Sequence, residues 1–251
     1  MVEALCVIHF PSHPTDSSSH EIPLDARRFG GSSLLEWIAR RVGDAQHVNQ
    51  IVVVVGPDEA TSPVVKLLPQ DVEVFTSQAN DALGQVADVV RHYRVEGVVR
   101  VSVDSPFVDP ELIDRLVDAA NAHPKCDYIG YSLSDGRPAI QSHIGVFADW
   151  YRASAILNAD QKAAHPEDRN DVTRFICGHT EMFQLRLLPA PAELDRQDLR
   201  LTVDMGEDWD HIEEIFDALG PESLDWKHIA GLLDRQPVML ARMADLNRCD
   251  D

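Results

Sequence analysis

Asp104 is the residue best placed to do chemistry, because it stands where a buried strand gives way to a helix. The segment 97–103 contains four valines, a pattern typical of a strand buried in a parallel sheet. Asp109 is suited to cap the following helix, and Pro110 suits its first position. Open α/β sheets bind ligands at the carboxyl ends of their strands, so Asp104 is a candidate metal ligand. Its alternative role is that of a turn or cap residue before Pro106.

The segments around Asp104 predict the sheet that would position it. Short apolar runs bounded by glycine, proline or polar loops predict strands at 5–10, 51–55, 72–75 and 97–103. Between them, apolar residues recur at helical spacing in 34–42 and 83–93, and Ser32 or Ser33 can cap the first of these helices. Strand, loop and helix therefore alternate, which indicates an α/β fold with a parallel sheet covered on both faces.

The second half of the chain is less regular. We predict strands at 127–132, 143–147 and 182–188, a helix from 148 to 158, and a short helix after the loop that begins at 165. A further strand ending in LTVD leads into the helix DWDHIEEIFDAL, and two short amphipathic segments follow. Since no repeat or long linker separates two units, we expect one α/β domain, 1–220, with a helical C-terminal extension, 221–251, packed on it.

The charge balance limits the partners of this chain. With 42 acidic and 22 basic side chains, its formal charge of -20 argues against binding to nucleic acid or to an anionic membrane surface. No apolar run is long enough for membrane insertion, and the N-terminus lacks the basic start of a signal peptide. The four cysteines show no CxxC spacing, so neither a zinc site nor a disulfide framework is expected. We therefore expect a cytoplasmic protein with reduced thiols.

Several stretches together resemble a known family. The resemblance is carried, in this order and spacing, by GGSSLLEWI, VVRVSVDSPFVDPELID, HPEDRNDVTRFI and LRLTVDMGEDWDHIEEIF. They are similar to the cytidylyltransferases of the spore coat polysaccharide type, relatives of the CMP-sugar synthetases. The resemblance implies a three-layer α/β/α sandwich of the nucleotide-diphospho-sugar transferase type, with a mostly parallel sheet. It further implies transfer of CMP from CTP to a sugar with Mg²⁺ present, in the synthesis of surface-polysaccharide precursors, and a tendency to form homodimers.

The resemblance also assigns roles to individual residues. Asp104 matches the metal-binding aspartate of the family, and Asp204 matches the second one. Arg169 falls in the loop that would face the sugar, where it would orient sugar or phosphate. If the chain is such an enzyme, the candidates for contacts with the nucleotide are Ser32 and Ser33 at a helix start, Ser77 and Asp81 in the loop after the third strand, and Arg100.

Each of the main charged residues also has a simpler structural role. Asp204 could cap the helix that follows it. Arg169 could pair with Asp168 or Asp171, which is common for an exposed arginine. Arg100 alternates with apolar residues in its strand and could be structural.

Departures from the family pattern favour a second hypothesis. The loop after the first strand, FPSHPTDSSSHEIP, lacks the glycine, lysine and arginine that grip phosphates in the family. Val103 stands in place of a glycine, AIQSHIG in place of the sugar-site run, and Asp171 in place of a histidine. The alternative is therefore a catalytically degenerate relative that acts as a binding or scaffold protein. A GT-A-type glycosyltransferase is a third hypothesis, but its usual Asp-x-Asp pair has only one acid here, Asp104.

The positions of four arginines should separate the first two hypotheses. Their convergence on a pocket between the two acids would restore the missing positive charge and favour catalysis. Their dispersal over the surface would favour the degenerate protein. These arginines are Arg27, Arg28, Arg100 and Arg169.

Overall fold

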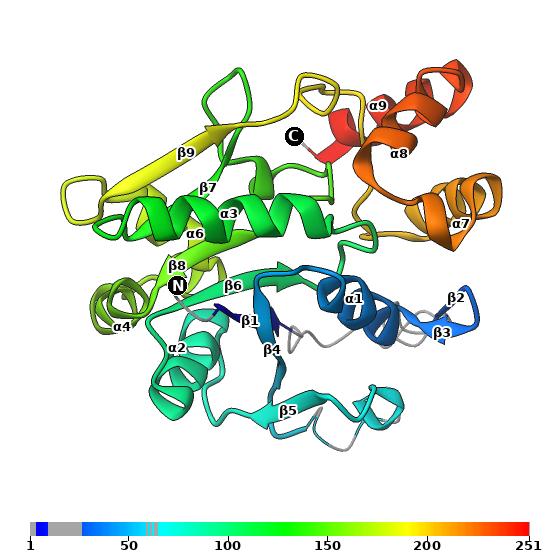
Figure 1. Cartoon of the computed structure of the whole chain (residues 1–251). Coiled ribbons are helices and arrows are strands. Elements are labelled where there is room, and N and C mark those ends of the chain that lie inside the picture. Colours follow the sequence, from blue (N-terminus) through cyan, green and yellow to red (C-terminus); the bar gives the residue numbers. More distant parts are fainter. Residues whose placement is uncertain (1–3, 10–26, 59, 61, 63–64, 251) are drawn as a thin grey trace.

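The computed structural model describes residues 4–9, 27–58, 60, 62 and 65–250. In this part of the chain, seven strands form one sheet in the order β5-β4-β1-β6-β8-β7-β9 (Figure 1). Their bounds are β1 Ala4–His9, β4 Val48–Val55, β5 Val72–Thr76, β6 Gly97–Ser102, β7 Tyr128–Ser132, β8 Asp149–Arg152 and β9 Leu185–Pro189. A separate two-stranded ribbon pairs β2 (Arg28–Phe29) with β3 (Ser32–Ser33).

Parallel pairing dominates the large sheet. The neighbours β5, β4, β1 and β6 are all parallel, and so are β7 and β9. The exception is β8, which runs antiparallel to both β6 and β7. The sheet is therefore mostly parallel, as predicted, and the carboxyl ends of β1, β4 and β6 lie along one edge.

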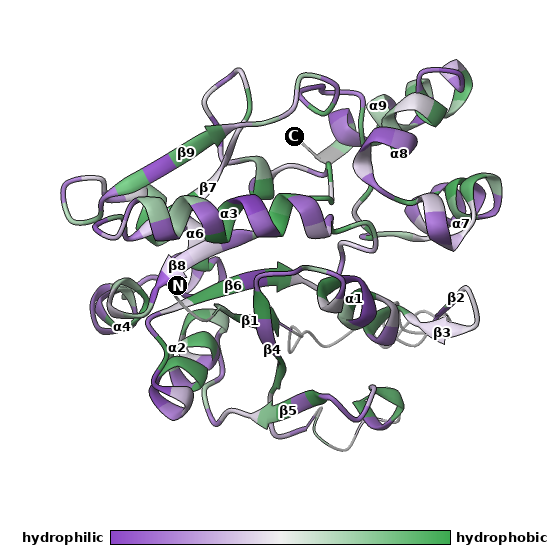
Figure 2. Cartoon of the chain, in the orientation of Figure 1, coloured by the Kyte–Doolittle hydropathy of each residue, from purple (hydrophilic) through white to green (hydrophobic). Residues whose placement is uncertain are grey.

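Helices cover both faces of the sheet because successive strand side chains point to opposite sides. Along β1, Cys6 and Ile8 pack in the cluster that includes α1 and α3, whereas Leu5 and Val7 pack in the one that includes α2, α4 and α6. Figure 2 shows strands such as β1 and β6 as largely hydrophobic and the helices as two-faced. This is the predicted three-layer sandwich. The helix bounds are α1 Leu34–Gly43, α2 Ala82–Tyr93, α3 Pro110–Ala122, α4 Ala153–Lys162, α5 Pro166–Asn170 and α6 Val172–Gly178.

The helix starts confirm the predicted capping residues. Ser33 Oγ accepts a hydrogen bond from Glu36 N at 3.2 Å at the start of α1. Asp109 Oδ1 accepts one from Leu112 N at 3.1 Å at the start of α3. The buried Asp109 also accepts a hydrogen bond from Trp226 N at 3.0 Å, through Oδ2. This cap therefore also ties α3 to the C-terminal part of the chain.

Two predictions for the segment 143–158 are wrong. Residues 143–147 do not form a strand, and the helix does not begin at 148. Instead, β8 comes first and α4 begins at Ala153. The aromatic residues Trp150 and Tyr151 are buried on opposite sides of the sheet, a pattern that favours a strand over an amphipathic helix.

The predicted strand ending in LTVD is also wrong. Residues 199–203 run as irregular backbone, and their hydrogen bonds go to loops rather than to a strand. Leu201 N donates to His143 O at 2.7 Å, and Val203 N donates to Asp104 O at 2.8 Å. The segment is held at the edge of the sheet without belonging to it.

The C-terminal helices lie together at one end of the molecule (Figure 1). They are α7 Gly206–Leu219, α8 Trp226–Leu233 and α9 Pro237–Asp250. Ile229, Leu233 and Met243 are fully buried in the same hydrophobic cluster as α1 and α3. These helices therefore complete one side of the core, and a domain division at residue 220 stays a prediction.

Two further findings concern the whole described chain. None of its helices combines the length and the apolar character needed to cross a membrane. All four cysteines are free.

Candidate functional site

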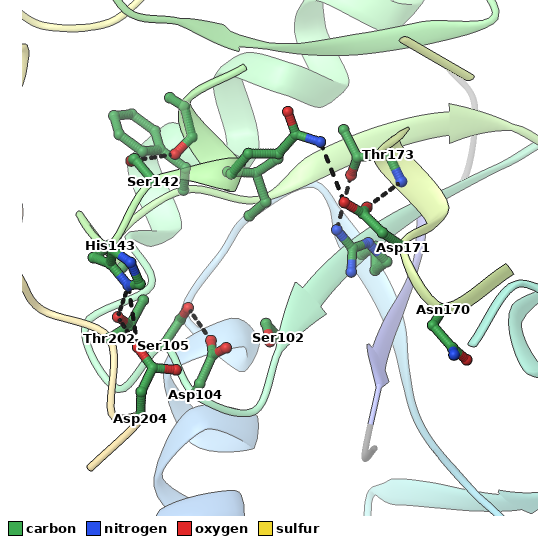
Figure 3. Close-up of a pocket in the computed structure, with 16 residues that line it drawn as sticks. Ser102, Asp104, Ser105, Ser142, His143, Asn170, Asp171, Thr173, Thr202 and Asp204 are labelled. Atoms are coloured by element: carbon green, nitrogen blue, oxygen red, sulfur yellow. Dashed lines mark hydrogen bonds and ion pairs between the residues drawn. The ribbon is translucent and has the colours of Figure 1, made fainter. Parts of the chain in front are cut away.

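A cavity of about 320 Å³ opens at the carboxyl end of β6. Its walls are the end of β6 with the following turn, the segment 139–147, the junction of α5 and α6, and the segment before α7. Figure 3 shows Asp104 and Asp204 toward one end of it and Asp171 with Thr173 toward the other. This is the edge of the sheet where the sequence predicts a ligand.

Asp104 lies in the turn after β6 and lines the cavity. Ser105 Oγ donates a hydrogen bond to its Oδ1 at 2.8 Å. Burial raises the pKa of Asp104, hydrogen bonds from Ser105 and Ser102 oppose this shift, and the nearby carboxylate of Asp204 adds to it. Two carboxylates that repel each other in one cavity are stabilised by a cation.

Asp204 reaches the same cavity on irregular backbone. The hydrogen bond from Val203 N to Asp104 O joins the two acidic segments. Gly145 permits the close approach of the opposite wall: its φ is +66°, and a Cβ there would lie 2.5 Å from the carbonyl carbon of Leu201. Only glycine accepts both conditions, so this residue fixes the shape of the cavity.

The Asp204 carboxylate is held through Oδ2. This oxygen accepts hydrogen bonds from Thr202 Oγ1 at 2.9 Å and Arg200 Nη2 at 3.3 Å, and lies 3.1 Å from His143 Nδ1. Burial raises the pKa of Asp204, but the contacts with His143, Thr202 and Arg200 outweigh it and lower the pKa overall. Asp204 is therefore an ionised carboxylate whose other oxygen, Oδ1, is available to a ligand.

A buried ion pair positions Asp204. Arg200 Nε lies 2.6 Å from Asp208 Oδ1, and both side chains are inaccessible to solvent. Asp208 Oδ2 accepts hydrogen bonds from Asp204 N at 3.0 Å and from Met205 N at 3.1 Å. Helix α7 is thus capped at Met205 by Asp208, and the alternative role of Asp204 as its cap is wrong.

Arg100 lines the cavity, and a buried network holds it there. Its Nη2 donates to Thr173 Oγ1 at 3.0 Å and lies 3.6 Å from Asp149 Oδ2. The fully buried Asp149 accepts hydrogen bonds from Tyr128, Tyr151 and Thr173 at 2.9, 2.8 and 2.9 Å. Burial raises the pKa of Asp149, and the Arg100 charge and these hydrogen bonds counteract the shift. Arg100 therefore has its own counter-ion beneath the cavity floor.

Asp171 forms the far end of the cavity. It caps α6, because its Oδ1 accepts hydrogen bonds from Thr173 N at 2.9 Å and Arg174 N at 3.1 Å. Its Oδ2 accepts a hydrogen bond from Gln141 Nε2, at the long distance of 3.3 Å. The carboxylate is thus fixed with one oxygen toward α6 and the other toward the opposite wall.

Arg169 lies outside the cavity. It pairs with carboxylates, although not with its neighbours in sequence: Nε lies 2.8 Å from Asp81 Oδ2 and Nη2 lies 2.8 Å from Asp160 Oδ1. Ser77 is buried and donates to Asp88 Oδ2 at 2.7 Å. The structure therefore brings Arg169 and Asp81 together, but away from Asp104 and Asp204.

The remaining predicted residues also lie elsewhere. The Ser32–Ser33 pair forms β3 and does not line the cavity. The Arg27 guanidinium lies 5.6 Å from the ring centroid of Trp209, and Arg28 is exposed in β2. Of the four arginines that were to separate the hypotheses, Arg100 is the one that lines the cavity.

Several polar residues that line the cavity have no role in the sequence analysis, and Gln141, His143 and Thr202 are among them. The stretch that contains Gln141 and His143 departs from the family pattern, which is a signal that this wall differs. Their spacing matches no known motif. Backbone hydrogen bonds from Leu201 N and Thr202 N to His143 O bring His143 beside Asp204, whereas Gln141 contacts Asp171.

The donors at the acidic end fit a cation that prefers oxygen ligands. Mg²⁺ takes one or two protein carboxylates and completes its shell with phosphate oxygens and water. Asp104 and Asp204 supply such a pair. Within the described ranges, no group of three His, Cys, Asp or Glu side chains could hold a metal ion without help. A metal here would therefore take the rest of its ligands from phosphate oxygens and water.

The fold and this acidic cavity define a nucleotidyltransferase-like protein. The family model of the MobA-like NTP transferase domain matches residues 26–203, well over half of the chain, and the chain belongs to this family. Among curated relatives, the spore coat polysaccharide biosynthesis protein SpsF of Bacillus subtilis (strain 168) is 24% identical over 218 residues. That match covers 84% of this chain and 87% of SpsF. The predicted resemblance is confirmed.

Solved structures agree on the fold. A cytidylyltransferase from Leptospira borgpetersenii matches with a TM-score of 0.78 and 20% identity, covering 96% of this chain and 97% of that one. CMP:2-keto-3-deoxy-manno-octonic acid synthetase, complexed with CTP, matches with a TM-score of 0.63 and 11% identity, covering 86% of this chain and 99% of that one. The predicted nucleotide-diphospho-sugar transferase-like fold is confirmed.

Proposed function

We propose that this chain is a Mg²⁺-dependent nucleotidyltransferase that transfers CMP from CTP to a sugar for a surface-polysaccharide precursor. The observation that carries the proposal is the meeting of Asp104 and Asp204 in one cavity at the carboxyl end of β6. The similarity to SpsF and the CTP complex of the synthetase of similar fold support the choice of nucleotide and pathway.

Charge explains why a metal is needed. Attack on the α-phosphate builds negative charge on its oxygens and on the leaving pyrophosphate. Bound Mg²⁺ would neutralise part of that charge as a Lewis acid. Asp104 and Asp204 would hold it, with His143 fixing the orientation of Asp204. Because Arg100 already has a buried counter-ion, this cavity depends on a cation from solution.

Other proposed contacts lie outside the cavity. The nucleotide extends beyond a cavity of this size, so residues around its rim can still meet it. Contacts to nucleotide or sugar by Ser32, Ser33, Ser77, Asp81 and Arg169 stay predictions. A homodimer also stays a prediction, to be tested by light scattering.

A degenerate binding or scaffold protein is the second candidate. The observation that favours it is the dispersal of Arg27, Arg28 and Arg169 away from the acidic pair. In addition, the sequence of the loop after the first strand, FPSHPTDSSSHEIP, contains no lysine or arginine that could supply positive charge. A site with so little positive charge would bind a triphosphate weakly.

A calorimetric titration of CTP, with and without Mg²⁺, separates the two candidates. We expect binding that requires Mg²⁺, and a loss of affinity of about tenfold or more in Asp104→Asn, because a metal ligand is removed. The matched control is Asp118→Asn on α3, whose side chain is 67% exposed and outside the cavity. It should bind CTP like the wild type.

Two outcomes would count against the enzyme. Absence of heat with CTP, ATP, GTP and UTP, all with Mg²⁺, would favour the degenerate protein. Binding that is equal in Asp104→Asn and in the control would show that the metal lies elsewhere.

A further inference from the structure

We infer that the far end of this cavity selects an acceptor sugar without a carboxylate, and that Asp171 rejects the acidic form. The inference rests on the proposed function and names its substrate class. It sets the chain apart from the synthetase of similar fold, whose name specifies a sugar acid.

The lysines and arginines near this cavity can be counted completely. Every lysine and arginine of the chain lies in the part that the structure describes. The remaining segments contain neither residue; they are 1–3, 10–26, 59, 61, 63–64 and 251. In the described part, Arg100 is the one lysine or arginine that lines the cavity. Three carboxylates, Asp104, Asp171 and Asp204, line it as well. The cavity is therefore acidic on balance.

Arg100 is poorly placed to bind a substrate carboxylate. A guanidinium recognises a carboxylate best with two parallel N–H groups. Its Nη2 already serves Thr173 and faces Asp149. Its Nε is buried away from solvent and has no hydrogen-bond partner among the described residues, so a ligand in the cavity does not reach it. The Nε side of the guanidinium is thus closed to a substrate carboxylate, and Nη2 is already shared with Thr173 and Asp149.

Asp171 adds a direct repulsion at this end. Its Oδ1 is committed to the two backbone N–H groups of α6, which prevents the carboxylate from turning away. Its Oδ2 accepts the long hydrogen bond from Gln141, and the carboxylate also interacts electrostatically with the charge of Arg100. Hydroxyl or ammonium groups of a sugar can donate to this oxygen, whereas a carboxylate would meet a like charge.

The end of the cavity with Asp104 and Asp204 offers no other binding position for the carboxylate of an acidic sugar. Asp104 and Asp204 hold the metal in the proposed function, and the phosphates of CTP complete its ligands. A sugar carboxylate could enter that end only by displacing phosphate. The groups that contact the acceptor sugar are therefore mainly hydrogen-bond acceptors. A neutral or amino sugar, which donates hydrogen bonds, fits them.

Matched sugars test this inference. Each series, gluco, galacto and manno, provides a neutral sugar, its amino form and its uronic acid, which differ in one group. They are titrated by calorimetry into protein saturated with Mg²⁺ and α,β-methylene CTP, whose P–C–P bridge cannot release pyrophosphate. We expect the uronic acid to bind weakest in every series that binds. In Asp171→Asn, uronic acid affinity relative to the neutral sugar should rise roughly tenfold, because one like charge is removed.

The matched control is Asp225→Asn. Asp225 caps α8 as Asp171 caps α6, accepting hydrogen bonds from Lys227 N and His228 N at 3.0 and 3.2 Å. Asparagine caps helices as well as aspartate does, so both variants should fold. The control should leave the order of the sugars unchanged.

The outcomes separate the two levels of the argument. The selection by Asp171 would be overturned if a uronic acid bound tightest. It would also be overturned if the ratio of uronic acid affinity to neutral sugar affinity were the same in Asp171→Asn as in the wild type. Binding of the nucleotide analogue with no binding in any of the three series would overturn the assignment of this end to the acceptor. Failure to bind the analogue at all would instead contradict the proposed function.

Discussion

The buried pair of Arg200 and Asp208 offers the sharpest test of how the site is supported. The perturbation is Asp208→Asn, which keeps the size of a side chain with no solvent exposure but removes its charge. The amide can still accept one hydrogen bond from Arg200. One further carboxylate that contacts Arg200 is Asp204, whose Oδ2 lies 3.3 Å from Arg200 Nη2 and whose side chain is 39% exposed.

The magnitude follows from burial. Removing one partner of a buried ion pair costs about 3–5 kcal/mol, because the other charge is left without compensation. Asp204 and the amide oxygen recover part of this, so we expect the free energy of unfolding to fall by about 3 kcal/mol. With an m value near the upper end for urea, about 3 kcal/mol per molar, the urea midpoint should fall by about 1 M.

The assay is urea unfolding followed by far-UV circular dichroism, with Glu207→Gln as the control. Glu207 is the neighbouring residue on the first turn of α7 and pairs with Arg242 at 2.6 Å, but their side chains are 36% and 58% exposed. Its loss should cost less than about 1 kcal/mol. Equal effects of the two substitutions would refute the argument, because Arg200 would then not need Asp208.

Three further changes test other parts of the fold. Burial, helped by the Arg242 charge, lowers the pKa of His211, so the unfolded chain binds a proton first and stability should fall as pH drops below about 6.5. His211→Leu should remove up to about 1.4 kcal/mol per pH unit of this dependence, measured by urea unfolding at pH 5 to 7. Asp109→Ala should cost about 2–4 kcal/mol in the same assay, because it removes the α3 cap and the bond to Trp226. Deletion of 221–251 should abolish cooperative thermal unfolding, because it strips buried side chains from the core.

The first half of the fold is predictable because its signals are local. The valine runs of β4 and β6 and the Asp109–Pro110 start of α3 each lie within one element. The strand β8 is different, because it begins with the buried acid Asp149. Much of its compensation comes from the Arg100 charge and from hydrogen bonds with Tyr128 and Thr173, all of which are distant in sequence. A reading of local periodicity does not contain this information.

The same distinction applies to the site. Asp104 is predictable because a strand, a turn and a capped helix place it. Arg169 shows the limit, since its partner Asp81 is 88 residues away and draws it out of the cavity. His143 has no local signal, because its contact with Asp204 depends on irregular backbone. Long-range polar contacts decide these positions, and no sequence spacing encodes them.

The last helix supports the segment that carries Asp204, although it does not line the cavity. Asn247 of α9 donates hydrogen bonds through Nδ2 to Gln197 O and Leu199 O at 2.9 and 3.0 Å. Its Oδ1 also accepts a long one from Arg200 Nη1, at 3.4 Å. The segment that carries Asp204 is thus clamped at its start by α9 and at its end by α7. Because that segment has no strand ladder of its own, these clamps replace the sheet in placing the second acid beside Asp104. The position of a proposed metal ligand therefore depends on residues of the predicted C-terminal extension.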